Sequence, residues 1–158
     1  MSNFLFSGDN TPTYGKSISD MEREGWIEKK NGTYVLTSNH DAAQAHCGGA
    51  WRMPTKDEFD NLSKKCEWIW DTRNSVNGYV VRGRGNYASK SIFLPAGGRG
   101  HGAAQICFGF SGSYWSSVPY SGSDCAYELD FSSLGRNTTY YNTCGYGRLV
   151  RPVQGFTK

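Results

Sequence analysis

The second half of the chain is a succession of short strand candidates separated by turn residues, and this pattern limits the fold more than any other feature. From residue 68 onward, runs of aliphatic and aromatic residues alternate with Gly, Asn, Ser and Pro. The candidates cover residues 68–70, 77–83, 91–98, 113–118, 126–133 and 148–153. In the fifth candidate, Tyr127, Leu129 and Phe131 alternate with Glu128 and Asp130, which predicts one buried face and one charged face.

The clearest helix signal lies before these strands, over residues 55–68. Thr55 has the side chain of an N-cap, and Glu58, three residues later, completes a capping box. Phe59, Leu62 and Cys66 recur at helical spacing on one side. We therefore expect this helix to pack its apolar side against the sheet.

Two shorter helices are expected closer to the N-terminus. Ser19 and Glu22 fit a capping box for a helix over residues 20–25, and Asn39 fits the N-cap of a helix over residues 39–47. Between them, Asn31-Gly32 separates two apolar runs, which is typical of a two-residue hairpin turn.

The order of these signals predicts an α+β domain, with two helices flanking a twisted, mainly antiparallel sheet that has long loops. Residues 1–20 are polar and rich in turn signals, so we expect an irregular lead-in or tether, followed by a single domain over residues 21–158. A chain of 158 residues is long enough to form one such core without metals or disulfides.

Charge and hydropathy exclude several classes of protein. The net charge is +3, and acidic residues are interspersed with the basic ones, so there is no basic stripe for nucleic acid. No apolar run approaches the roughly 18 residues of a membrane span, and the N-terminus lacks the features of a signal peptide. We expect a cytoplasmic or virion-associated protein.

Cysteine and histidine spacings give no cofactor or metal site. The five cysteines are an odd number without metal-ligand spacing; a bridge between Cys47 and Cys66 is possible, but free thiols fit better. His40 and His46 are six residues apart, which does not place them on one helix face. The glycine-rich run 97–102 opens no helix and lacks the Gly-Lys-Ser/Thr of a phosphate loop.

Residues 109–153 have the composition of a binding surface. They contain six of the ten tyrosines, set among Ser, Gly, Asn and Thr. Tyr supplies a large amphipathic contact area with few rotatable bonds, and small polar residues supply adaptable hydrogen bonds, as in antibody paratopes. The stretch therefore indicates binding rather than chemistry.

A restriction of residue types in the same region has two explanations. Apart from Glu128, every residue in 116–149 belongs to the set encoded by codons ending in a pyrimidine. Repeated mutation of Asn codons at their first two bases gives such a set. Strands and turns, however, are poor in Lys, Glu, Gln and Met in any case.

Several strings resemble one family when taken in order. They are DAAQAHCGGAWRMPTKDEFDNL (41–62), NGYVVRG (77–83), SIFLPAGG (91–98), SYWSSVPYS (113–121) and GRLVRPV (147–153). The chain resembles, over roughly residues 34–154, the "major paralogous domain" family of gut bacteria and gut phages, which has the C-type-lectin-like fold and is related to formylglycine-generating enzymes. Some members are similar to the variable proteins of diversity-generating retroelements, in which a reverse transcriptase diversifies Asn codons while the fold holds the resulting side chains on its exposed face.

This resemblance implies a variable region at 108–149 on a constant scaffold. The scaffold would include the turn Trp51 to Thr55 and two central strands, Tyr114 to Ser117 and Arg148 to Val153. The displayed residues would be Tyr120, Ser121, Ser123, Asp124 and Cys125 in one loop; Glu128 and Asp130 on the outward face of a strand; and Arg136, Asn137, Thr138, Thr139, Tyr140, Tyr141, Asn142, Thr143, Cys144, Tyr146 and Leu149 in the last long loop.

Departures from the family bear on function. The Glu-Pro-Asn, Gln-Pro-Asp and Trp-Asn-Asp strings of calcium-dependent lectins do not occur, and neither does the closely spaced cysteine pair of the oxidases.

The leading hypothesis is a display protein that recognises a protein or glycan ligand, with phage tail or surface assembly subunits as further partners. The alternatives are a structural or adhesive domain without diversification and, third, a Cys-dependent oxidase. Trp51, Trp68, Trp70 and Trp115 are expected in the core, and Arg148 and Arg151 in scaffold salt bridges.

Overall fold

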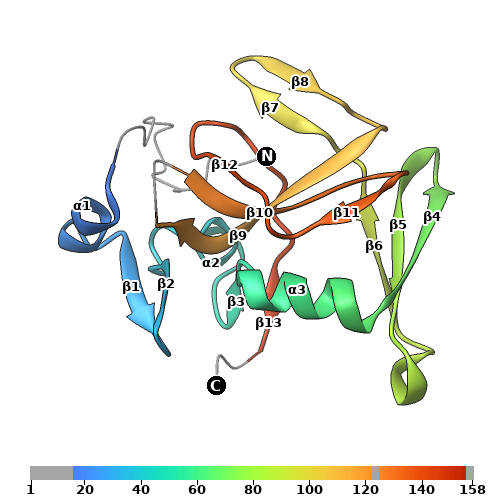
Figure 1. The fold of residues 1–158 in the computed structure, drawn as a ribbon, viewed down its shortest axis with the longest axis horizontal. Helices are drawn as coiled ribbons and strands as arrows, with labels where there is room; N and C mark the ends of the chain where they lie inside the picture. The colour runs from blue at the N-terminus through green and yellow to red at the C-terminus, as the bar shows by residue number, and fades with distance from the viewer. Residues whose placement is uncertain (1–15, 122–124, 156–158) are drawn as a thin grey trace.

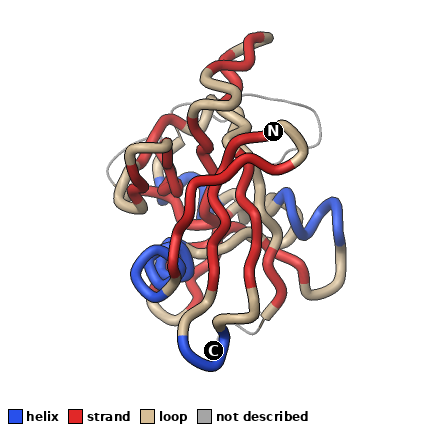
Figure 2. The backbone as a smooth tube through the Cα atoms, turned by 90° about the vertical axis from the view of Figure 1, so that its right-hand side faces the viewer, coloured by secondary structure: helices blue, strands red, loops and turns tan. Residues whose placement is uncertain are grey.

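Small antiparallel sheets make up most of the computed structural model, which describes residues 16–121 and 125–155. The expected α+β class is confirmed. The described residues contain three α-helices rather than two, because the short helix near residue 20 is formed as well. Figure 2 shows strands through the middle of the molecule and helical segments at its margins.

The longest strands form a four-stranded sheet across the middle of Figure 1. Strands β9 (Ser111–Tyr120) and β10 (Cys125–Ser132) are antiparallel, and the other edge of β10 pairs with β11 (Gly135–Asn137) and β12 (Tyr141–Thr143). Phe131 lies opposite Gly112, where an added Cβ would come within 2.3 Å of the Phe131 ring. Glycine is therefore required at this close approach.

A second sheet lies at the right of Figure 1 and consists of β4 (Glu67–Arg73), β5 (Val76–Arg82) and β6 (Ser91–Pro95). Trp68, Trp70 and Tyr79 turn their rings edge-on to Phe131, with centroids 6.3, 6.4 and 5.4 Å away. Edge-to-face geometry is favourable for aromatic pairs. This cluster joins the two sheets, so the expected core roles of Trp68 and Trp70 are confirmed.

Helix α3 (Lys56–Lys65) begins as the sequence predicts. The Thr55 side chain accepts a hydrogen bond from the Glu58 amide, and the Glu58 carboxylate accepts one from the Thr55 amide. Phe59 is buried in the aromatic core, with Leu62 and Cys66 packed against it. The helix lies along β9 and β10, as expected from its single apolar side.

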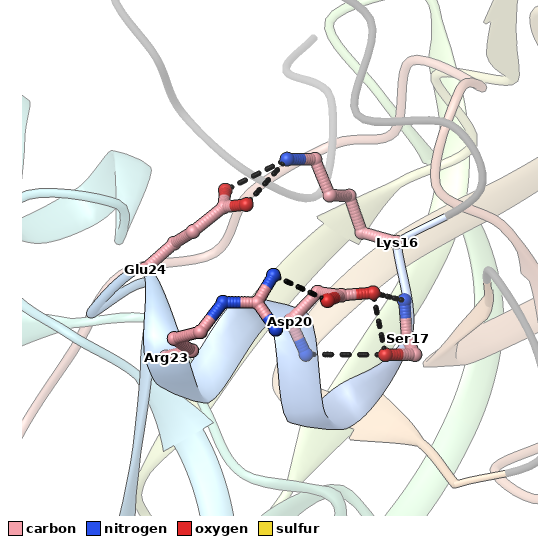
Figure 3. A network of polar contacts seen from close by, with 5 residues as sticks. All are labelled: Lys16, Ser17, Asp20, Arg23 and Glu24. Carbon is pink, nitrogen blue, oxygen red and sulfur yellow. Dashed lines mark hydrogen bonds and ion pairs between the residues drawn. The ribbon is translucent and has the colours of Figure 1, made fainter.

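The first helix, α1 (Ile18–Arg23), has a different cap from the predicted one. Its capping box joins Ser17 and Asp20, not Ser19 and Glu22 (Figure 3). The helix begins at Ile18, and its buried residue, Met21, lies in the core.

The hairpin of β1 (Ile27–Lys30) and β2 (Thr33–Leu36) turns at Asn31-Gly32 as predicted. Both turn residues have positive φ, 49° and 84°, as a type I′ turn requires.

Helix α2 (Ala42–Cys47) is capped by Asp41 and not by the predicted Asn39. The Asp41 carboxylate accepts hydrogen bonds from two amides of the helix and also from the amide of Met53, next to β3 (Trp51–Arg52). One buried side chain thus joins the start of the helix to the residue that follows the next strand, β3. Gly48, with φ 65°, ends the helix as expected.

The predicted strand at 148–153 is only partly formed. Leu149 makes a parallel bridge to Tyr114, and β13 (Val153–Gln154) pairs with β3. The segment between them passes from one sheet to the other, which interrupts a regular strand. The remaining short elements are η1 (Gly85–Tyr87), β7 (Arg99–His101) and β8 (Ala104–Ile106), the last two forming the hairpin at the top of Figure 1.

A second core cluster contains Met21, Ile27, Leu36, Met53 and Trp115, with Trp115 fully buried as expected. Trp51 is half-buried beside β13. None of the described helices is long and apolar enough to cross a membrane.

Candidate binding surface

The Tyr-rich stretch divides into a buried set and an exposed set of side chains. An irregularity in the pairing of β9 with β10 accompanies this division: Ala126 lies opposite Pro119 but Glu128 lies opposite Trp115, so β9 carries two extra residues at this step. Next to this irregularity the alternation of buried side chains along β10 changes phase, since Glu128 and Leu129 are both buried. Tyr127 therefore lies half-exposed and Glu128 is buried, the opposite of the sequence prediction.

Glu128 is consequently not a displayed residue. It is only 4% exposed and forms an ion pair with Arg148, which is 0% exposed. The Arg148 guanidinium also lies 5.2 Å from the Trp115 ring centroid and 5.1 Å from that of Tyr146. The expected scaffold salt bridge of Arg148 is confirmed, and its partner is the one residue of 116–149 outside the restricted set.

Three other predicted display residues also face inward, at least in part. Cys144 is 1% exposed and belongs to the core cluster around Trp115. Leu149 packs against the aromatic core, and Asp130 is half-buried, where it accepts a 2.7 Å hydrogen bond from the Ser113 hydroxyl. The assignment of Cys144 to the displayed surface is wrong because the chain turns inward after β12 to reach Arg148.

The other predicted residues have solvent-accessible side chains. Tyr140 and Tyr141 are 55% and 47% exposed. Ser121, Arg136, Thr139 and Thr143 are also exposed, and the partly exposed members are Tyr120, Cys125, Asn137, Thr138, Asn142 and Tyr146. Ser123 and Asp124 lie outside the described residues.

Three tyrosines form a row across the end of the central sheet, which we call the tyrosine row. The rings of Tyr120 and Tyr141 are stacked, with centroids 3.7 Å apart and planes 5° from parallel. Tyr127 meets Tyr120 edge-on at 5.5 Å, and the Lys56 ammonium lies 5.4 Å from the Tyr127 ring centroid. The row therefore runs from β12 across β9 and β10 to the first turn of α3.

Hydrogen bonding within the tyrosine row affects its ionisation. The hydrogen bond to Tyr141 raises the pKa of Tyr120 above its ordinary value of 10.0, because it stabilises the protonated phenol, and the neighbouring groups act in the same direction. Tyr120 therefore keeps its hydroxyl proton over the physiological pH range.

Sequence reasoning missed Tyr127 as a surface residue. The alternation in 126–133 places it on the buried face, but burial along β10 changes phase between Glu128 and Leu129, and this leaves Tyr127 half-exposed. Such a change of phase leaves no sequence signal here, although the abundance of Tyr in the stretch could have drawn attention to it.

The 136–139 segment forms a separate part of the surface, alongside α3. The Arg136 guanidinium donates to the hydroxyl and the carbonyl of Ser63 and lies 4.8 Å from the Trp68 ring centroid. Thr138 hydrogen-bonds to Asp60 of α3 and contributes to lowering the pKa of that carboxyl. These two residues brace the loop against the helix.

The opposite end of the last loop is held by backbone bonds to the β7–β8 hairpin. Gly100 and Gly147 exchange two hydrogen bonds, of 2.7 and 3.0 Å, and the His101 ring lies 5.0 Å from that of Tyr146. The loop is therefore anchored on both sides, which limits the ordering that a ligand would have to impose.

Within the part of the chain that the structure describes, no three His, Cys, Asp or Glu side chains are grouped to hold a metal ion. All five cysteines are free thiols, including Cys47 and Cys66. The arrangement provides aromatic rings, hydroxyls and amides, which are groups for binding.

The chain was compared with protein-family models, with curated proteins and with solved structures. None of the three comparisons gave a match.

Proposed function

We propose that the protein is a recognition domain that binds a protein or glycan target through the exposed side chains of residues 120–146. One observation carries this proposal: a single stretch separates cleanly into buried framework residues and an exposed, Tyr-rich face. Tyr140, Tyr141 and the tyrosine row offer aromatic anchors of the type that dominates binding energy at interfaces. We assign the protein no catalytic role.

We further propose that this face belongs to a C-type-lectin-like variable protein of a diversity-generating retroelement, carried by a phage or mobile element. The segments that resemble the family support this proposal, because they pair with one another in the buried framework. The 51–52 strand pairs with 153–154, and Tyr114 bridges Leu149. Glu128, the one exception to the restricted residue set, is a buried structural residue, as expected if only displayed positions are diversified.

Sequencing the gene and its close relatives from one population tests both statements. Substitutions should concentrate at exposed positions such as Tyr120, Thr139, Tyr140, Tyr141 and Thr143. A near-copy of the 3′ end with Asn codons at these positions should lie beside a reverse-transcriptase gene.

Buried neighbours in the same stretch provide the control. Glu128, Leu129, Phe131 and Arg148 should stay constant although they lie between variable codons. Substitutions scattered evenly over buried and exposed positions would overturn the diversification proposal.

A structural or adhesive domain is the second candidate, and one observation favours it. Phe108, Phe110 and Leu134 are 57%, 77% and 97% exposed. Exposed apolar side chains mark a contact with a partner chain where they form a contiguous patch, and Phe108 and Phe110 lie only two residues apart in the chain. If the population carries no diversified codons and the purified protein assembles into oligomers, the structural or adhesive function replaces the recognition function.

A further inference from the structure

A cleft of about 460 Å³ lies between the β1–β2 hairpin and the first turn of α3. Its volume falls within the range of roughly 300–1,000 Å³ that is usual for small-ligand sites. The hairpin contributes Lys30, Asn31 and Thr33, and the helix contributes Lys56 and Asp57. Most of the cleft is thus built from framework residues outside the variable region.

The tyrosine row ends in this cleft. The half-exposed Tyr127 lines one wall, and the buried Val35 and Val118 add apolar surface. A ligand in the cleft therefore meets an aromatic ring together with polar groups.

The charges of the cleft are balanced and mostly engaged. Lys30 pairs with Glu28 at 2.8 Å, and Lys56 pairs with Asp60 at 2.7 Å. Glu58, which also lines the cleft, is held by Arg52. Since two lysines face two acidic side chains there, neither an anion nor a cation gains much from entering.

A smaller recess of about 90 Å³ adjoins the cleft and shares Lys30, Val35 and Thr55 with it. Arg52 lines this recess, and its Nε is buried without a hydrogen-bond partner. Ser38, Gln44 and Ser117 add further polar side chains around it.

We propose that this cleft binds a neutral sugar residue, independently of whether the exposed face is diversified. The apolar C–H face of a pyranose packs on the Tyr127 ring, its hydroxyl groups exchange hydrogen bonds with the side chains of Asn31 and Thr33, and one hydroxyl donates to the Asp57 carboxylate. An exocyclic hydroxyl enters the recess and meets the polar side chains of Ser38 and Gln44. A neutral ligand with many hydroxyls matches the mixture of donors and acceptors and the absence of surplus charge.

The test uses the full chain and the methyl glycosides of glucose, galactose, mannose and N-acetylglucosamine as probes. Titration followed by ¹H–¹⁵N NMR should show saturable shifts of the amides of 31–33 and 55–57 for at least one glycoside, with a Kd on the order of 1 mM. Tyr127→Ala should weaken this binding roughly tenfold. Asp57→Asn, at an exposed position that keeps the fold, should weaken it severalfold.

Matched controls separate this site from the exposed face. Tyr87→Ala and Asp71→Asn remove the same groups elsewhere on the surface and should leave the affinity unchanged. Tyr140→Ala should impair recognition by the face but not glycoside binding. The sugar-site proposal is overturned if no glycoside shifts the cleft amides, or if binding survives both Tyr127→Ala and Asp57→Asn; neither result bears on the exposed face.

Discussion

The buried ion pair of Glu128 and Arg148 is the framework contact on which the last loop depends, and Glu128→Gln tests it without creating a cavity. Arg148 is fully buried, and its two terminal nitrogens have no hydrogen-bond partner, so Glu128 is its sole hydrogen-bonded countercharge among the described residues. Removing one partner of a buried pair costs about 3–5 kcal/mol, because an uncompensated charge is left in the interior. For a domain of this size, that loss lowers Tm by roughly 6–20 °C.

Urea denaturation and calorimetry of Glu128→Gln, compared with the unmodified protein, measure this loss. Glu28→Gln is the control, since Glu28 pairs with Lys30 at the surface, where both side chains are nearly half exposed. An exposed pair contributes at most about 1 kcal/mol.

The double variant Glu128→Leu/Arg148→Met completes the test. Replacing both charges with apolar side chains should recover much of the lost stability, because no unpaired charge remains. If Glu128→Gln costs no more than the Glu28→Gln control, the buried pair does not hold the loop as argued.

Two further predictions concern ionisable groups. Burial raises the pKa of Glu58, but hydrogen bonds from Arg52 and Thr55 outweigh this effect and leave the pKa below its ordinary value of 4.5. The ionised Glu58 therefore adds to the free energy of unfolding above pH 4.5, and this contribution is lost as the pH falls through the pKa of the folded state. Urea denaturation from pH 6 downward should show that the difference in free energy of unfolding between the unmodified protein and Glu58→Gln shrinks in acid. Glu67→Gln is the exposed control, and a difference that does not change with pH would contradict this prediction. Tyr141→Phe removes the hydrogen-bond partner of Tyr120, so NMR titration should find the Tyr120 pKa moved back toward 10.0, and an unchanged value would show that the two rings are not paired as described.

The sequence by itself determined the elements whose signals are local. The Asn31-Gly32 turn requires two residues that tolerate positive φ, and the Thr55–Glu58 capping box closes within one helical turn, so neither depends on distant residues. The alternation of strand and turn residues likewise predicted the α+β class and most strands.

The tertiary structure alone decided which side chains the Tyr-rich stretch presents. Glu128 points inward where β9 and β10 pair irregularly, and Arg148, twenty residues later, requires a countercharge there. Asp41 rather than Asn39 caps α2 because its carboxylate also reaches the amide of Met53. These outcomes depend on contacts between residues distant in the chain, and a periodic pattern read along one strand carries no information about them.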